Sequence, residues 1–158
     1  MKKNNIKYFL AANSAEGFVS YFSNCYDCKD GWKVYIIKGG PGTGKSSFMK
    51  FLVAKASEKN IKAELCPCSS DPDSLDAVIF RDKKVVILDG TAPHTLDPSY
   101  AGVCEEILNF GMLWKTEKLL ENKKAILELT DKNKSLHKSA ALYLGALREI
   151  LMDNIKLL

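Results

Sequence analysis

Residues 39–46 have the types and the spacing of a phosphate-binding loop, and we call them the glycine loop. Their sequence, Gly-Gly-Pro-Gly-Thr-Gly-Lys-Ser, fits the pattern G-x-x-x-x-G-K-S/T. Glycines let the backbone turn sharply and approach a ligand closely, so that successive amides point at a polyphosphate. Lys45 would add a positive charge at the β- and γ-phosphates, and the Ser46 hydroxyl would coordinate Mg²⁺. The residues expected to bind nucleotide are Gly39, Gly40, Pro41, Gly42, Thr43, Gly44, Lys45, Ser46 and Ser47.

Asp89 is a second candidate because it ends the apolar run 85–88. A carboxylate at the end of a strand beside a phosphate-binding loop helps to hold Mg²⁺ in P-loop proteins. The plain alternative is that Asp89 only terminates a strand. We expect Ser46 and Asp89 to be the metal residues, and ATP or GTP with Mg²⁺ to be the ligand.

The residue after Asp89 is Gly90, where many ATPases carry a glutamate that orients the attacking water. A catalytic base must then come from elsewhere, or hydrolysis is slow. The following loop, 90–98, contains His94, which can contact phosphate, position water or bind an acceptor. It can equally hydrogen-bond within its own loop. The candidate catalytic residues are Lys45, Asp89 and His94.

The elements that must position these residues are a strand before the glycine loop and a helix after it. Continuous apolar strands that alternate with helices indicate parallel βαβ units. We therefore predict an α/β fold, a P-loop NTPase-like parallel sheet of three to four strands with flanking helices. The predicted strands are 8–11, 33–38, 61–66 and 85–89, and the predicted helices are 14–23, 46–59, a turn at 72–79 and a short helix within 100–112.

The C-terminal residues 113–158 have a helical pattern with apolar side chains every three or four residues. We predict a long helix, or a helical hairpin broken near 131–134, following a nucleotide-binding domain at 1–112. The helix either lies on its own domain or forms a dimer. The pattern runs to the last residue and the strands are few, which favours the N-terminal piece of a longer protein. The seam residues are Ile126, Leu129, Asn133, Leu136, Ala140, Tyr143, Leu147, Ile150, Asn154 and Leu157.

Composition places the chain among ordinary globular proteins. It has 158 residues, of which 46% are hydrophobic and 27% charged, and a formal net charge of +4. The lysines are spread along the chain, which argues against a nucleic-acid surface, and we see neither a signal peptide nor a membrane span. We expect a cytoplasmic protein with its five cysteines reduced. A zinc site drawn from Cys25, Cys28, Cys66 and Cys68 is conceivable, but thiols without metal are the expectation.

Three motifs occur together in order: the glycine loop, Cys-Ser-Ser-Asp-Pro-Asp-Ser-Leu-Asp at 68–76, and Asp-Gly-Thr-Ala-Pro-His at 89–94. The set resembles an uncharacterised family of P-loop ATPase-like proteins found among Firmicutes. In that family a second P-loop half follows, so this sequence would correspond to the N-terminal half. The resemblance implies nucleotide binding. The apolar seam of the C-terminal helix separately predicts that this helix self-associates or, in a longer chain, docks on the second half.

Three functions fit these observations. The first is binding of a nucleoside triphosphate, ATP in preference to GTP, with hydrolysis. The second is a P-loop kinase that transfers phosphoryl to a small acceptor near Asp71, Asp73 and His94. The third is a nucleotide-sensing module with little turnover. Gly90 in place of glutamate favours the second and third, and the family resemblance favours the first.

Overall fold

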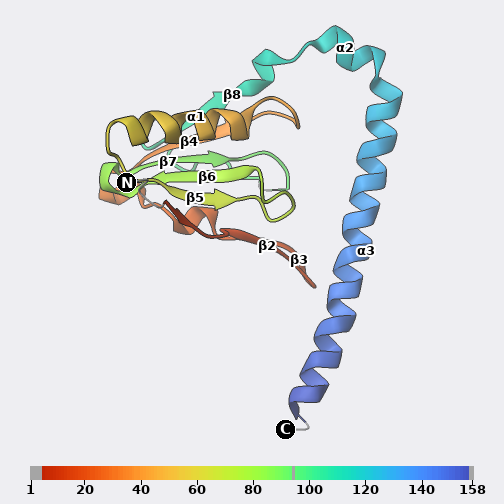
Figure 1. Ribbon diagram of the computed structural model, residues 1–158. Helices are drawn as coiled ribbons and strands as arrows, with labels where there is room; N and C mark the ends of the chain where they lie inside the picture. Colours follow the sequence, from red (N-terminus) through yellow and green to blue (C-terminus); the bar gives the residue numbers. More distant parts are fainter. Residues whose placement is uncertain (1–4, 94, 157–158) are drawn as a thin grey trace. The chain divides into compact units, whose positions relative to one another are not determined.

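The protein is a mixed α/β structure with a six-stranded sheet and a long C-terminal helix, shown as a computed structural model in Figure 1. The structure describes residues 5–93 and 95–156. The chain divides into two compact units. The first unit comprises the residues up to Ala11 and Ser20–Leu113, and the second comprises Ala12–Val19 and the residues from Trp114 onward.

The sheet of the first unit has the strand order β1-β5-β6-β7-β4-β8. The central strand β4 pairs in parallel with β7 on one side and with β8 on the other. Strand β6 is antiparallel to both of its neighbours, β5 and β7, and β1 is parallel to β5. The strands are β1 (Ile6–Lys7), β4 (Lys33–Lys38), β5 (Glu64–Pro67), β6 (Leu75–Phe80), β7 (Val85–Asp89) and β8 (Glu105–Asn109).

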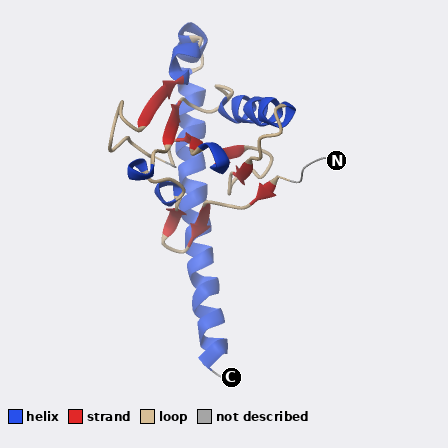
Figure 2. Ribbon diagram, turned by 90° about the vertical axis from the view of Figure 1, so that its left-hand side faces the viewer, coloured by secondary structure: helices blue, strands red, loops and turns tan. Residues whose placement is uncertain are grey.

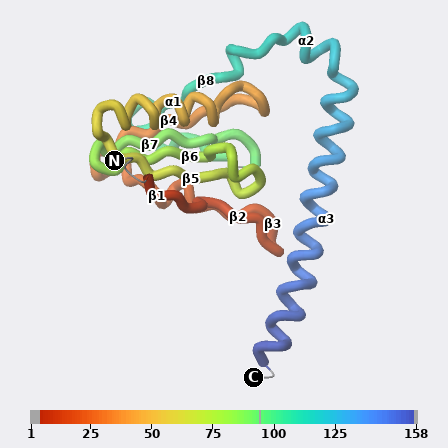
Figure 3. Tube along the Cα trace, in the orientation of Figure 1, coloured from red at the N-terminus to blue at the C-terminus, as the bar shows by residue number. Residues whose placement is uncertain are grey.

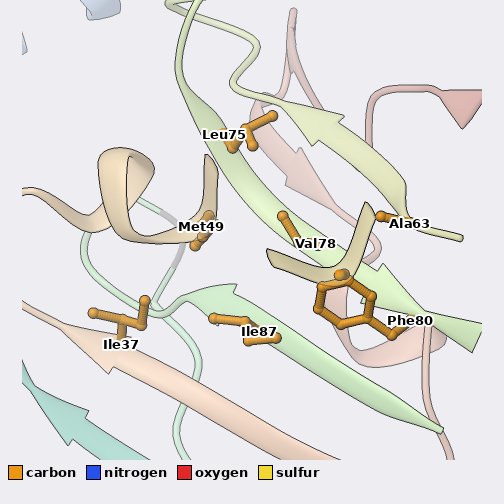
Figure 4. Close-up of a cluster of buried hydrophobic side chains, with 8 residues drawn as sticks. Ile37, Met49, Ala63, Leu75, Val78, Phe80 and Ile87 are labelled. Atoms are coloured by element: carbon orange, nitrogen blue, oxygen red, sulfur yellow. The ribbon is translucent and has the colours of Figure 1, made fainter. Parts of the chain in front are cut away.

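Helix α1 (Lys45–Glu58) covers one face of this sheet, as the two views in Figures 1 and 2 show. Its Met49 is fully buried and packs in one hydrophobic cluster with Ile37 of β4, Val78 of β6 and Ile87 of β7. Figure 4 shows these side chains between the helix and the strands. Because β4 and β7 are apolar runs buried in the middle of the sheet, their positions follow from the hydrophobic effect. The sequence-based predictions of strands 33–38 and 85–89 and of helix 46–59 are confirmed, the helix to within a residue.

The predicted helix at 14–23 is wrong. Strands β2 (Ala11–Ser14) and β3 (Gly17–Ser20) form a two-stranded sheet there, and a short 3₁₀ helix, Phe22–Asn24, follows. The Ser14 hydroxyl donates to the Gly17 carbonyl over 2.9 Å and accepts from the Glu16 amide. A serine side chain can satisfy the backbone of a hairpin turn as well as that of a helix start, so the serine does not separate the two structures.

The predicted helical turn at 72–79 is also wrong, because β6 occupies most of it. All six residues of β6 are buried, and such an apolar run fits a helix and a fully buried strand equally. The sheet therefore has six strands rather than three to four, and β5, β6 and β7 follow one another as antiparallel strands without a crossover helix. Within 100–112, strand β8 precedes a short 3₁₀ helix, Phe110–Leu113.

A disulfide joins Cys28 and Cys104, which corrects the expectation of five reduced cysteines. Cys28 shortly precedes β4 and Cys104 directly precedes β8, and these two strands are parallel neighbours. The pairing of β4 with β8 thus brings together two cysteines 76 positions apart in the sequence. The bond also removes Cys28 from the conceivable four-cysteine zinc site. Cys25 and Cys66 are buried thiols, and Cys68 is half-buried.

The second unit contains the short helix α2 (Thr116–Glu121) and the continuous 34-residue helix α3 (Lys123–Lys156). The helix passes through 131–134 without a break, so a hairpin at that place is excluded. None of the described α3 residues is buried. An ion pair joins Arg148 of α3 to Glu16 of the β2–β3 turn, with 2.9 Å between Nη1 and Oε1. No helix within 5–93 and 95–156 combines the length and the apolar character needed to cross a membrane.

Candidate functional site

The glycine loop connects the carboxyl end of β4 to the first residue of α1, and Figure 3 follows the chain through it. Gly42 has a φ of +77° and Gly44 a φ of +87°, both in the left-handed region that favours glycine. Gly44 is the N-cap of α1 and offers no side chain to its first amides. These amides point out of the helix end, where the helix dipole favours an anion.

Lys45 lies at the first position of α1 and folds back over the glycine loop. Its Nζ donates to the Gly39 carbonyl over 2.7 Å and to the Gly40 carbonyl over 3.0 Å. The same nitrogen lies 3.5 Å from Oδ2 of Asp89, and both side chains are only 12% exposed. The ammonium is therefore held between the loop and the end of β7, with a carboxylate as its counter-charge.

Asp89 is the last residue of β7 and is oriented by the next turn. Its Oδ1 accepts a hydrogen bond of 2.8 Å from the Thr91 amide, which leaves Oδ2 facing Lys45. The Thr91 hydroxyl donates to the Gly39 carbonyl over 2.9 Å. This turn therefore ties the end of β7 to the start of the glycine loop.

Ser46, the other predicted metal residue, connects α1 to β6. Its hydroxyl oxygen accepts a hydrogen bond of 3.0 Å from the Leu75 amide, at the first residue of β6. The serine keeps its own proton and a second lone pair, so it can still coordinate a cation or contact a phosphate.

These residues surround one pocket in the first unit with a volume of about 400 Å³. The predicted nucleotide residues Gly42–Ser47 and the predicted metal residue Asp89 all line it. Gly39, Gly40 and Pro41 form the preceding part of the loop and do not line it. The remaining lining residues come from the loop between β5 and β6 and from the start of β6: Cys68, Asp71, Ser74, Leu75 and Asp76.

Asp76 is a pocket residue that sequence reasoning missed. It is only 4% exposed, and the strand that carries it was predicted as a helical turn. Ala77 and Leu88 are the last pair of the ladder between β6 and β7, and Asp76 and Asp89 follow this pair on the two strands. The sequence signal that could have revealed it is the one charged residue in the buried run Leu-Asp-Ala-Val-Ile-Phe.

Gly90 is glycine because there is no room for a side chain. A Cβ at this position would lie 2.4 Å from Cγ2 of Ile36 and 3.0 Å from the Leu96 carbonyl oxygen. The Gly90 carbonyl accepts a hydrogen bond of 2.9 Å from Lys38, whose Nζ also lies 2.7 Å from Asp97. A water-orienting glutamate therefore does not fit after Asp89.

Of the other predicted residues, Asp71 lines the pocket and is exposed, and its Oδ2 accepts from the Ser74 hydroxyl. Asp73 does not line the pocket, and its backbone carbonyl accepts from Lys50. His94, the third candidate catalytic residue, lies outside the described residues.

The pocket contains one thiol, Cys68. Burial raises the pKa of this thiol, and the nearby Asp76 carboxylate raises it further. Hydrogen bonds from the Ser70 and Asp71 amides lower this pKa but do not cancel the rise. At neutral pH the thiol is therefore protonated and a poor nucleophile.

Comparisons of the chain with protein-family models, with curated proteins and with solved structures find no match.

The pocket offers oxygen donors to a cation. Within 5–93 and 95–156 no group of three or more His, Cys, Asp or Glu side chains is placed to hold a metal. Mg²⁺ needs fewer protein ligands than this, because it keeps several water ligands and binds one or two carboxylates together with substrate phosphates. Ser46, Asp76 and Asp89 supply oxygen only and line the same pocket. This donor set fits Mg²⁺ in a nucleotide complex.

Proposed function

We propose that the chain binds a Mg²⁺–nucleoside triphosphate, ATP in preference to GTP, in the pocket of the glycine loop, and hydrolyses it. The observation that carries this proposal is the position of Lys45. Its ammonium lies over the loop carbonyls and 3.5 Å from Asp89, at the first turn of α1. A loop, a helix start, a lysine and a strand-end carboxylate at one pocket are the parts that phosphoryl chemistry uses.

Groups of this chain would contact the phosphates directly. The amides of residues 42–47 and the N-terminal end of α1 attract negative charge without a side chain. Lys45 moves its ammonium from the loop carbonyls to the β- and γ-phosphates. Ser46 and Asp89 would hold the cation, which would supply positive charge against the charge of the phosphates.

Hydrolysis by this chain on its own is slow under the proposal. Gly90 leaves no room for a water-orienting side chain, and His94 is the base candidate from sequence. The only arginines are Arg81 and Arg148. Glu64 binds the guanidinium of Arg81, and Arg81 does not line the pocket, so it supplies no positive charge to the transition state.

The proposal includes the P-loop NTPase fold, membership of the family resembled by the three motifs, and a cytoplasmic location. Parallel pairing of β4 with β7 supports the fold, because it sets Asp89 beside the glycine loop at the carboxyl edge of both strands. The exposed apolar side chains of α3 support a partner for that helix, either a second copy or a second P-loop half.

A kinase is the second candidate, and Asp71 is the observation that favours it. This carboxylate is exposed and lines the pocket opposite the glycine loop. A carboxylate at that place can accept a proton from an alcohol that attacks the γ-phosphate.

The test is a titration of the purified chain with ATP, GTP and ADP in Mg²⁺ by calorimetry, followed by phosphate release without an added acceptor. Triphosphate binding with steady phosphate release supports the ATPase. Binding with release only when an alcohol acceptor is added supports the kinase, and binding without turnover supports the sensing module. No binding of any nucleotide at millimolar concentration overturns the proposal.

A further inference from the structure

Asp76 and Asp89 are two buried carboxylates on neighbouring strands, only 4% and 9% exposed. The antiparallel ladder between β6 and β7 ends with Ala77 opposite Leu88, and Asp76 and Asp89 are the residues that follow this last pair on the two strands. Both residues line the same pocket.

Both carboxylates lie at the end of the sheet where α1 begins. Asp89 is two residues from Ile87, which packs in the hydrophobic cluster with Met49 of α1, as Figure 4 shows. The register of β6 against β5 shifts between Ala77 and Leu75, so strict alternation does not hold at Asp76. The lining of the pocket nevertheless includes both carboxylates together with the first residues of α1, 45–47.

Charge makes this pair informative. Like charges close together on neighbouring strands destabilise a sheet, and burial away from water raises the cost of each charge. Lys45 is the only lysine or arginine among the residues that line the pocket, and it lies 3.5 Å from Asp89. A single ammonium cannot balance two carboxylates and then also move to a triphosphate. A divalent cation supplies the positive charge that the pocket lacks once the phosphates engage Lys45.

We propose that Asp76 acts with Asp89 as a paired-carboxylate site for the divalent cation that accompanies the nucleotide, with the Ser46 hydroxyl as the third protein oxygen. This inference rests on the nucleotide site proposed above. It adds Asp76 of β6 as a cation-binding residue to Asp89, which the sequence motif at the end of β7 provides. It also accounts for the one charged residue in an otherwise apolar, buried strand.

The experiment compares Asp76→Asn and Asp89→Asn with unmodified protein by titrating a fluorescent ATP analogue, once in EDTA and once in Mg²⁺. Asn keeps the shape of Asp and removes the charge. The control is Glu105→Gln, which neutralises another buried carboxylate, on β8 and outside the pocket, bound by Tyr26 and Tyr100.

Asp76→Asn should reduce the gain in ATP affinity that Mg²⁺ gives by about tenfold to a hundredfold, as loss of a metal-supporting residue does. In EDTA its affinity should be unchanged or higher, because one negative charge near the phosphates has gone. Asp89→Asn should behave in the same way, and Glu105→Gln should keep the full effect of Mg²⁺.

Three results overturn the inference in different ways. If Asp76→Asn loses the same ATP affinity in EDTA and in Mg²⁺, Asp76 has a structural role only. An unchanged Mg²⁺ effect would exclude it from the cation site while leaving the nucleotide proposal intact. If the unmodified chain binds no nucleotide, the proposed function and this inference fail together.

A second measurement needs no variant and covers the case in which Asp76→Asn does not fold. Mn²⁺ replaces Mg²⁺ in the ATP complex of unmodified protein with ¹³C at the aspartate carboxyl carbons. Electron–nuclear double resonance should then detect two carboxyl carbons coupled to the ion. Coupling to a single carboxyl carbon contradicts the proposal.

Discussion

Ser46 and Leu75 join the helix that follows the glycine loop to strand β6, through a 3.0 Å hydrogen bond from the Leu75 amide to the Ser46 hydroxyl. Leu75 is buried and begins the strand that carries Asp76. The serine that the sequence assigns to Mg²⁺ thus also fixes the opposite wall of the pocket. Ligand binding in the pocket should therefore affect the hydrogen bond at the start of β6.

Ser46→Ala should destabilise the protein by about 1–3 kcal/mol, because the buried Leu75 amide loses its acceptor. Hydrogen exchange at the Leu75 amide should become faster in the variant. Ser47→Ala is the matched control, since this neighbouring serine is exposed and its loss should change the unfolding free energy by less than about 0.5 kcal/mol. Equal stability of the two variants in urea would show that the hydrogen bond contributes nothing.

Lys45→Ala should weaken triphosphate binding by about 1.5–3 kcal/mol, ten- to a hundredfold, because one charge-assisted contact is lost. Calorimetry with ATP and Mg²⁺ measures this. Lys55→Ala is the control, because Lys55 pairs with Glu58 at the exposed far end of α1. Unchanged affinity in Lys45→Ala would refute the phosphate-binding role of the glycine loop.

Gly90→Ala should destabilise the protein by about 1–3 kcal/mol through overpacking, because the new methyl group meets Ile36. Gly145→Ala in α3 makes the same chemical change where a Cβ has ordinary contact, 3.8 Å from Ala15. There a gain of up to about 1 kcal/mol is expected from helix propensity. Thermal unfolding of both variants measures these changes. A Gly90→Ala protein as stable as the unmodified protein would show that position 90 can accommodate a side chain.

Glu64 gives a pH dependence with a definite sign. Two hydrogen bonds from Arg81 and one from Tyr8 hold the pKa of the Glu64 carboxyl below its ordinary 4.5. A lowered folded-state pKa adds stability above the unfolded value and loses it as pH falls through the folded value. The stability difference between the unmodified protein and Glu64→Gln should therefore shrink as pH falls from about 6 to about 3. A difference that stays constant in urea unfolding across this range would contradict the assignment.

Helix α3 should mediate self-association through the seam that begins at Ile126. Leu136 and Leu147 lie on this seam and are 59% and 51% exposed, and a heptad seam buries such residues against another helix. Leu136→Lys with Leu147→Lys should give a monomer in sedimentation without loss of nucleotide binding.

The control for this double variant places two lysines off the seam, Leu127→Lys with Leu142→Lys, at positions that are also exposed. It should associate as the unmodified chain does. A monomeric unmodified chain at high micromolar concentration would reject self-association and leave a second half as the partner. Leu157, the last predicted seam residue, lies outside the described residues.

The sequence by itself determined the glycine loop, the central strands β4 and β7, α1 and the helical character of α3. Each is recognisable from its own residues: glycines and a lysine at fixed offsets, apolar runs of strand length, and a helical period. Asp89 was found in the same way, because it follows an apolar strand directly. These are local signals, and they do not depend on which segment pairs with which.

Only the tertiary structure decided which residues line the pocket opposite the glycine loop, at the start of β6. A buried run such as 75–80 becomes a strand because β5 and β7 offer backbone partners on both sides, and no local period encodes those partners. The same pairing sets Asp76 beside Asp89, and the pairing of β4 with β8 brings Cys28 to Cys104. Gly90 looked like a lost catalytic residue in the sequence, whereas the packing of Ile36 against it is what excludes a side chain.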